Sequence, residues 1–269
     1  MDLAFCSLGS GSSGNSYLIR SEKTNILIDA GLYCRTIINY LNMLDMGPGK
    51  VNGILISHEH VDHMRGVNMM LERGKCIVCY ATQGTFDCVE EKLTYLHDGN
   101  RAVLSSGQDL TIGDLQIHTF SLSHDAVDPI GFTIRKNDKK IAIVTDTGCI
   151  TDEIREAIAG ADLLVLESNH EKNILLYGRY PYSVKRRILS DKGHLSNEDA
   201  AYGISDFLKT VKPGAVPRVM LAHISKENNT PAQAVLTVRN ILQEEGYYVG
   251  KDLMLDTLDK DSMTNMIYL

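Results

Sequence analysis

The run from residue 57 to residue 63 concentrates side chains that can bind a metal ion. It reads Ser-His-Glu-His-Val-Asp-His and directly follows the apolar residues 53–56. Imidazole nitrogens and carboxylate oxygens are ligands that zinc, manganese and iron accept. A loop at the end of a strand can point several of them at one spot, whereas a helix would spread them around its circumference. The spacing therefore predicts a metal-binding loop.

Four more segments end a β-like run with a candidate ligand. These ligands are Asp29 after residues 25–28, His124 after residues 120–123, Asp146 after residues 141–145 and His223 after residues 219–222. Histidine and aspartate gathered at strand ends are typical of a metal or catalytic site. Five such strand ends in one chain predict that the ligands meet at one place.

Taken in order, these motifs resemble those of the metallo-β-lactamase superfamily: an early Asp, His-x-His-x-Asp-His, a lone His, a lone Asp and a final His. The resemblance implies two divalent metal ions (Zn, Mn or Fe) as cofactors. One ion would be held by His58, His60 and His124, the second by Asp62, His63 and His223, and Asp146 would bridge the pair. Asp29 would orient a ligand histidine through a hydrogen bond.

Hydrolysis is the chemistry that such a centre favours. Two metals about 3.5–4 Å apart lower the pKa of a shared water toward 7 and stabilise the entering and leaving oxygens. Asp62 is expected to act as a ligand and also to orient or deprotonate the attacking water.

Two motifs outside the metal set bear on the substrate. Glu167 follows a strand-like run, and His194 lies just before a predicted helix. They resemble the acidic and His-x-Thr/Ser motifs of superfamily nucleases, in which a Glu-oriented histidine protonates the leaving oxygen. Glu167 and His194 are therefore candidate catalytic residues. The alternative is that His194 merely lies beside the cap of the helix that begins near Ser196.

A locally basic segment connects these two motifs. Residues 178–194 contain five Lys and Arg residues against the single acid Asp191, and tyrosines are interleaved. Basic side chains can neutralise phosphates and tyrosine rings can stack on bases, so the candidate substrate contacts include Arg179, Lys185, Arg186 and Ser196. A solvated loop and helix face would have the same composition.

The glycine-rich run at residues 9–15 matches Gly-x-Gly-x-x-Gly, but a strand-like pattern follows it. A dinucleotide site needs a helix there, so no dinucleotide cofactor is expected. The run could still bind a phosphate through Ser10, Ser12 and Asn15, or it could be a tight hairpin that uses glycine for its backbone freedom.

Several local strings carry a narrower resemblance, to the bacterial YycJ/WalJ family. They lie at residues 10–16, 123–132, 180–188, 193–197 and 221–229. The family implies a 5′→3′ exonuclease that acts on double-stranded DNA. A hydrolase of a small thioester or lactone, or an RNA-processing nuclease of the same fold, stays open as an alternative. His170 has no role in this scheme.

Length and composition limit the number of domains and the classes of function that the chain can have. The chain has 269 residues, 43% of them hydrophobic, and a net charge of −7, which argues against a broad basic face for nucleic acid. We expect one domain over residues 1–269, because the ligands come from both halves. No apolar run approaches the length of a membrane span, and the first residues lack the pattern of a signal peptide, so a cytoplasmic protein is expected. The oligomeric state stays open.

The resemblance implies an α/β fold of four layers, the αβ/βα sandwich. Periodicity predicts strands near residues 3–8, 16–20, 24–29, 53–57, 76–81, 109–112, 115–121, 130–135, 140–145, 162–167 and 253–255. It predicts helices near residues 37–44, 64–71, 151–159, 196–210 and 231–245, with caps at Thr151 and Ser196. No element is assigned to the polar stretch that ends at residue 192.

Overall fold

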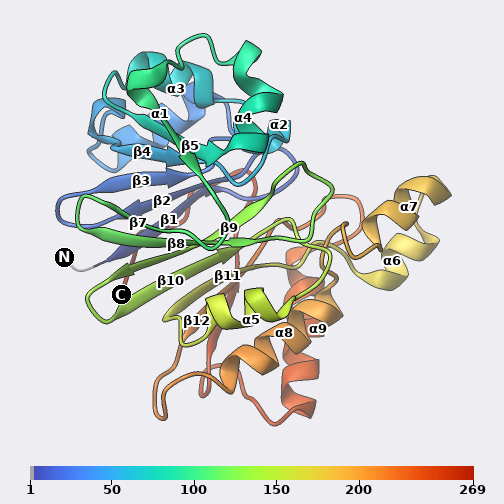
Figure 1. Cartoon of the computed structure of the whole chain (residues 1–269). Helices are drawn as coiled ribbons and strands as arrows, with labels where there is room; N and C mark the ends of the chain where they lie inside the picture. Colours follow the sequence, from blue (N-terminus) through green and yellow to red (C-terminus); the bar gives the residue numbers. More distant parts are fainter. Residues whose placement is uncertain (1–2) are drawn as a thin grey trace.

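A computed structural model describes residues 3–269 of the chain. Within them, two seven-stranded sheets face each other, and helices cover the outer face of each (Figure 1). The predicted four-layer αβ/βα sandwich is confirmed.

The first sheet is built from the N-terminal third of the chain and one strand from the C-terminus. In spatial order its strands are β14 (Ile267–Tyr268), β1 (Ala4–Gly9), β2 (Ser16–Arg20), β3 (Asn25–Ile28), β4 (Gly53–Leu55), β5 (Val78–Thr82) and β6 (Arg101–Leu104). Strands β3 to β6 run parallel, whereas β1 and β2 are paired with their neighbours in antiparallel fashion.

The second sheet repeats this plan with the rest of the chain. Its order is β13 (Met254–Thr257), β12 (Arg218–Ala222), β11 (Leu163–Glu167), β10 (Lys139–Val144), β9 (Ile130–Lys136), β8 (Leu115–Ser121) and β7 (Asp109–Ile112). The four strands from β10 to β13 are parallel, and the four from β7 to β10 are antiparallel. Because β8 and β10 both pair antiparallel with β9, they run in the same direction.

Helices on the first sheet are α1 (Cys34–Met43), α2 (Val61–Met64), α3 (Val67–Arg73) and α4 (Gln83–Val89), with short 3-10 turns at Pro48–Lys50, Glu90–Lys92 and Asp98–Asn100. The second sheet carries α5 (Asp152–Ile158), α8 (Asn197–Leu208) and α9 (Pro231–Glu244) on its outer face (Figure 1). Thr151 and Ser196 cap α5 and α8 by accepting backbone N–H bonds, as predicted.

Three apolar clusters hold the layers together. One lies between the sheets and includes Phe5, Tyr17 and Phe132, while the other two join each sheet to its own helices. Burial of this much apolar surface on both faces explains why the strands are near-continuous runs of Val, Ile and Leu.

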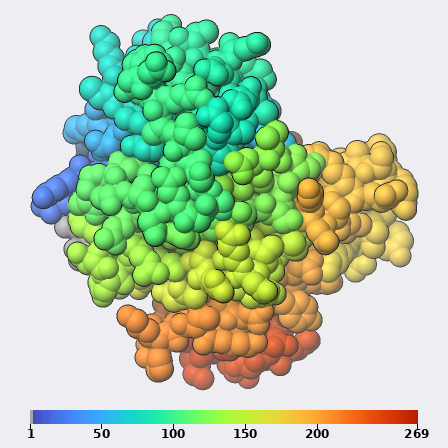
Figure 2. Space-filling view, in the orientation of Figure 1, coloured from blue at the N-terminus to red at the C-terminus, as the bar shows by residue number. Residues whose placement is uncertain are grey.

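The segment between β11 and α8 contains helices that were not predicted from the sequence. It contains two short helices, α6 (Lys172–Tyr177) and α7 (Tyr182–Ile188), which project from the body of the sandwich (Figures 1 and 2). Each has at most seven residues, and Gly178 and Pro181 separate them. Helices this short carry too weak a periodic pattern to be recognised in a polar sequence.

Other differences are local. The single helix predicted near residues 64–71 is divided into α2 and α3 at Gly66, whose backbone passes so close to Ala30 and Leu32 that a Cβ would clash. The strand predicted at residues 76–81 begins at Val78, and α4, β6 and β14 were not predicted. In the described part of the chain, no helix is long and apolar enough to cross a membrane.

Candidate metal centre

The sheet topology collects the predicted ligands at one edge of the sandwich. Asp29 follows β3, the loop with His58 and His63 follows β4, and Asp146 and His223 follow β10 and β12. The carboxyl ends of parallel strands point to the same edge, where ligands of open α/β sheets commonly bind. His124 follows β8, which runs in the direction of β10, so it reaches the same place.

At three of these strand ends, the residue that enters the site has an unusual backbone conformation. Asp29, Asp146 and His223 have φ angles of 59°, 60° and 51°, in the left-handed region. Such a conformation costs about 1–3 kcal/mol per residue and persists where the surrounding structure enforces it, often at functional sites. Here it marks the three points at which a strand turns sharply into the site.

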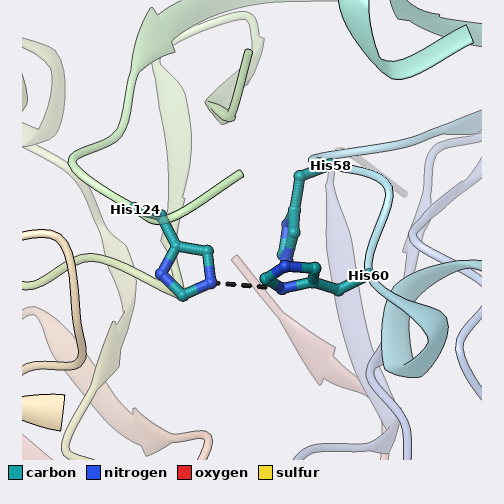
Figure 3. A group of neighbouring side chains, drawn as sticks. All are labelled: His58, His60 and His124. Atoms are coloured by element: carbon teal, nitrogen blue, oxygen red, sulfur yellow. Dashed lines mark hydrogen bonds between the residues drawn. The ribbon is translucent and has the colours of Figure 1, made fainter. Parts of the chain in front are cut away.

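The first group of side chains comprises His58, His60 and His124 (Figure 3). One ligand atom from each lies within 4.8 Å of the others. His60 Nδ1 is 3.3 Å from His124 Nε2, and the Nδ1 atom of His124 donates to the carbonyl of Gly193 at 3.0 Å. That hydrogen bond leaves Nε2 of His124 as the nitrogen that faces the group.

A second group comprises Asp62, His63 and His223, and a third joins His58 and His63 to Asp146. Asp146 lies between the first two groups: its Oδ2 is 3.1 Å from His63 Nε2 and its Oδ1 is 3.9 Å from His124 Nε2. The structure thus brings together the two predicted ligand sets, with Asp146 between them.

Asp29 and Ser57 determine the orientation of two histidines. His63 Nδ1 donates to Asp29 Oδ2 at 2.7 Å, and the backbone N–H of Ser57 donates to the other oxygen at 2.8 Å. The Ser57 hydroxyl lies 2.9 Å from both Asp29 Oδ2 and His58 Nδ1. These contacts favour the tautomer that carries its proton on Nδ1. When the ring is neutral, Nε2 then directs its lone pair inward, as in many histidine ligands of metals.

Several inward-facing atoms have no hydrogen-bond partner among the described residues. They are His58 Nε2, His223 Nε2 and Asp146 Oδ2, all buried. Buried polar atoms without a partner are costly, and here they are acceptors that face one another. His63 Nε2 likewise opposes Asp146 Oδ2. A cluster of lone pairs in a buried place fits divalent cations, and the N/O donor set suits zinc, manganese or iron.

The pKa shifts divide the ligand histidines into two kinds. Burial would lower the pKa of His63 and of His223, but the Asp146 carboxylate outweighs it and holds both well above the ordinary value, so metal binding at these rings must displace a proton. Burial, assisted by the neighbouring His63, holds the pKa of His58 well below its ordinary value, so the ring is neutral. Burial alone would raise the pKa of Asp146, but His223 and His63 outweigh it and hold that pKa well below its usual range. A neutral imidazole and an ionised carboxylate are the forms that bind metal.

Glu167 lies behind the centre and is fully buried. Its Oε1 accepts from His194 Nδ1 and from His223 Nδ1, each at 2.8 Å, and its Oε2 accepts from the backbone N–H of Thr147 at 2.9 Å. Burial would raise the pKa of Glu167, but His194 outweighs it and lowers the pKa to about 2. The same carboxylate raises the pKa of His194 against the effect of burial. Glu167 therefore orients His223 as well as His194.

Three of the predicted substrate contacts are buried and bonded internally. Ser10 accepts from the backbone N–H of His223 at 2.9 Å, and Ser196 caps α8. Asn15 accepts from the N–H of Gly11 at 2.9 Å, and its Nδ2 is 3.1 Å from His63 Nε2. These side chains therefore support the site, and a direct contact with substrate through them stays a prediction.

The remaining four predicted contacts differ among themselves. Lys185 Nζ donates to the carbonyls of Leu176 and Gly178 at 2.8 and 2.7 Å, so it ties α6 to α7. Ser12, Arg179 and Arg186 are exposed. A direct substrate role stays open for these three.

The glycine-rich run forms the hairpin between β1 and β2 and packs beneath the His loop. Asn15 N–H donates to the carbonyl of Asp62 at 2.8 Å, and Gly31 N–H donates to the carbonyl of Asn15 at 2.8 Å. A Cβ on Gly31 would lie 1.6 Å from the carbonyl oxygen of Asp62, so only glycine fits there. The run positions the ligand loop.

Sequence reasoning missed Ser57, the Gly193 carbonyl and the second hydrogen bond of Glu167. A signal existed for Ser57, because a serine directly before a ligand histidine can reach that ring and its neighbours. A carbonyl offers no such signal, since every residue has one.

Comparison with known proteins places this geometry in a family. A family model described as "Beta-lactamase superfamily domain" matches residues 24–224. Exodeoxyribonuclease YycJ of Bacillus anthracis is 35% identical over 269 residues, which is all of both chains. Exodeoxyribonuclease WalJ of Streptococcus pneumoniae serotype 2 is 36% identical over 259 residues, covering 96% of this chain and 94% of that protein. The chain belongs to the metallo-β-lactamase superfamily.

The fold agrees with this membership. The metallo-beta-lactamase fold protein YhfI from Bacillus subtilis superposes with a TM-score of 0.72 at 14% identity, covering 98% of this chain and 99% of that one. The metallo-β-lactamase fold and the cluster of histidine and aspartate side chains make this chain a metal-dependent hydrolase. Its cofactors are divalent metal ions.

Proposed function

We propose that this superfamily member is a dinuclear metal-dependent nuclease, a 5′→3′ exonuclease on double-stranded DNA. The observation that supports it most is the hydrogen bond between His194 and the buried Glu167 beside the candidate centre. A phosphodiester's leaving alkoxide needs a proton, whereas a thioester's thiolate leaves without one. The names of the YycJ and WalJ relatives favour the same substrate class.

We propose that the ligands divide between two ions. One set is His58, His60 and His124, and the other is Asp62, His63 and His223, with Asp146 between them. When bound, two divalent ions supply a hydroxide at neutral pH and stabilise negative charge on the phosphate oxygens. We also propose that residues 1–269 act as one domain, because both sheets contribute ligands.

Asp62 is the proposed residue for orienting the attacking water. Its Oδ2 lies 3.7 Å from His63 Nε2 and 3.6 Å from His223 Nε2, and its side chain is the more exposed partner in both contacts. A carboxylate that touches the ligand set from the solvent side can accept a hydrogen bond from water as it approaches phosphorus.

His194 is the proposed proton donor. Glu167 engages its Nδ1, which leaves Nε2 to face the substrate, and the Glu167 carboxylate stabilises the protonated ring. As the new P–O bond forms, the bond from phosphorus to the sugar oxygen breaks, and that oxygen takes the His194 proton.

Duplex DNA is supported by the exposed surface next to the centre. Arg187 forms an ion pair with Asp125, the neighbour of His124, so the base of α7 is attached to the site. Exposed Arg179 and Arg186 and the exposed ring of Tyr177 lie on the same projecting segment. Cations and aromatic rings of this kind suit phosphates and bases at the end of a duplex.

The test compares His194→Ala with the wild type on two phosphodiesters in the presence of Mn or Zn. On end-labelled duplex DNA we expect a loss of about 100-fold, because the alkoxide needs its proton. On bis(p-nitrophenyl) phosphate we expect little change, because nitrophenolate leaves unprotonated.

His118→Ala is the matched control, since His118 also contacts a carboxylate, Asp109, at 2.8 Å but lies on the surface. Single-stranded DNA, RNA, a thioester and a lactone are assayed in parallel. Hydrolysis of the small esters alone would contradict a nuclease, and a preference for RNA would contradict DNA. The cytoplasmic location stays a prediction.

A further inference from the structure

A cavity of about 420 Å³ opens beside His194, on the side of the second sheet's helices. Its wall includes His194 and His170, the loop residue Ile150, Leu189 after α7, and Tyr202 and Gly203 on α8. We refer to it as the α8 cavity. Its volume lies within the range of about 300–1,000 Å³ that small-molecule sites occupy.

The α8 cavity adjoins the candidate centre through His194. This ring contacts Glu167 and lies with its centroid 5.1 Å from that of His124 and 5.2 Å from that of His223. A molecule in the cavity would therefore lie beside the proposed proton donor.

His170 is the unusual residue in the wall. It is 1% exposed, and neither of its ring nitrogens has a hydrogen-bond partner among the described residues. Burial lowers the pKa of His170 to about 4, so the ring is neutral and has one donor and one acceptor. Nothing in the metal centre uses them. The two nitrogens point away from each other, so a ligand in the cavity would satisfy one of them, directly or through a water.

The charges of the wall do not suit a phosphate. Lys172 is paired with Glu198 and Asp199 at 2.9 and 3.2 Å. Arg155 is similarly paired with Asp152 and Asp206. Both cations are thus already neutralised by carboxylates. The surfaces that stay available are the ring of Tyr202, which is 52% exposed, and the aliphatic side chains of Ile150 and Leu189.

We propose that the α8 cavity binds the nucleoside that leaves the scissile phosphate, with Tyr202 against its base and His170 hydrogen bonded to the base edge. A nucleobase has a flat face for the Tyr202 ring and polar edge atoms for one nitrogen of His170, and the cavity volume lies within the small-molecule range. The proposal rests on the proposed nuclease function. It predicts that the leaving group is a terminal nucleoside held in the cavity.

Direct binding tests the cavity without any need for catalysis. Thymidine and deoxyadenosine are titrated into the wild type and into Tyr202→Ala, His170→Asn and Tyr248→Ala by calorimetry. Tyr248 is the matched control, because it is 49% exposed, close to the value for Tyr202, and lies outside the cavity. Tyr202→Ala should weaken binding about tenfold through lost stacking, His170→Asn should also weaken it, and Tyr248→Ala should have no effect.

Activity gives the second readout. Tyr202→Ala should lower kcat/KM on duplex DNA about tenfold, whereas Tyr248→Ala should leave it unchanged. No saturable nucleoside binding to the wild type, or equal weakening by Tyr202→Ala and Tyr248→Ala, would overturn the proposal. Nucleoside binding as expected, without hydrolysis of any phosphodiester, would overturn the nuclease function and leave the cavity as a nucleoside site.

Discussion

The metal centre and the α6–α7 segment differ in how deeply they bury their polar and aromatic side chains. In the centre, His58, His63 and Asp146 are buried, and each contacts other polar residues at hydrogen-bond or ion-pair distance. On the segment, Tyr177 is 89% exposed and Tyr182 is 76% exposed. The first region is held rigidly by two sheets, while the second is attached through contacts such as the Arg187–Asp125 ion pair.

We infer from this difference that the buried centre carries out the reaction and that the exposed segment selects the substrate. Buried ligands are preorganised, so they can stabilise a reacting group without rearrangement. Exposed side chains on a projecting segment contribute little to the fold, and they can differ between members of a superfamily without disturbing the centre. Changes in the two regions should therefore affect different measurements.

The largest effect is expected from Asp62→Asn. The amide cannot accept the proton of the attacking water, so turnover on duplex DNA should fall about 1,000-fold or more, with Tm nearly unchanged. Initial rates and thermal unfolding measure the two quantities. Asp109→Asn, at a carboxylate 88% exposed, is the control and should retain activity. Wild-type turnover in Asp62→Asn would remove this residue from the mechanism.

The second-largest effect is expected from removal of the metal ions, which should lower the thermal stability of the protein. Each ion that binds only the folded state at a thousandfold excess over Kd contributes about 4 kcal/mol, so chelation of two ions should lower Tm by about 20 °C. Metal analysis should find two ions per chain before chelation. Tyr177→Ala should show the same drop as the wild type, whereas His223→Ala should show a smaller one. An equal drop in His223→Ala would exclude it as a ligand.

Smaller effects are expected on the segment. Arg186→Gln should weaken duplex DNA binding a few-fold, because one phosphate contact is lost. It should also reduce the slope of log K against log salt by about 0.9. Hydrolysis of bis(p-nitrophenyl) phosphate should not change. Arg239→Gln, on α9 away from the segment, is the control. A loss on both substrates would mean that Arg186 supports the centre and does not contact DNA.

The smallest effect concerns a cation that lies inside the sandwich. Burial lowers the pKa of Lys140 to about 8, below its ordinary 10.5, so its charge destabilises the folded state at neutral pH. As pH rises from about 8 to 10.5 the unfolded state binds more protons, and the wild type should gain stability.

Lys140→Met should therefore have a Tm a few degrees higher than the wild type at pH 7, with the difference shrinking toward pH 10. Lys192→Met, at an exposed position of the segment, should show no such trend. A difference that is constant with pH would mean that the ammonium is not destabilised by burial.

The metal centre was easier to predict from the sequence than the α6–α7 segment. The His loop, the later strand ends and the caps at Thr151 and Ser196 were predicted correctly in position, because each depends on a local pattern next to a strand or helix. Helices α6 and α7 were missed, because Gly178 and Pro181 break a polar sequence into pieces too short to show a period.

Side-chain roles were harder to predict than positions. Ser10 and Asn15 were expected to contact substrate, yet they are buried beneath the His loop. Their polar types were the observation available, and a polar type does not reveal whether its partner is a ligand or the backbone of His223, 213 residues away.

The sequence by itself determined the donor set and the strand ends that carry it, because ligand chemistry depends on residue type and strand formation depends on local periodicity. The tertiary structure alone decided which atoms face each other. The parallel strands brought Asp146 between the two histidine groups, Glu167 reached both His194 and His223, and the α8 cavity formed where α5, α8 and the segment meet. These contacts join residues far apart in the chain, so they exist only once both sheets have packed together.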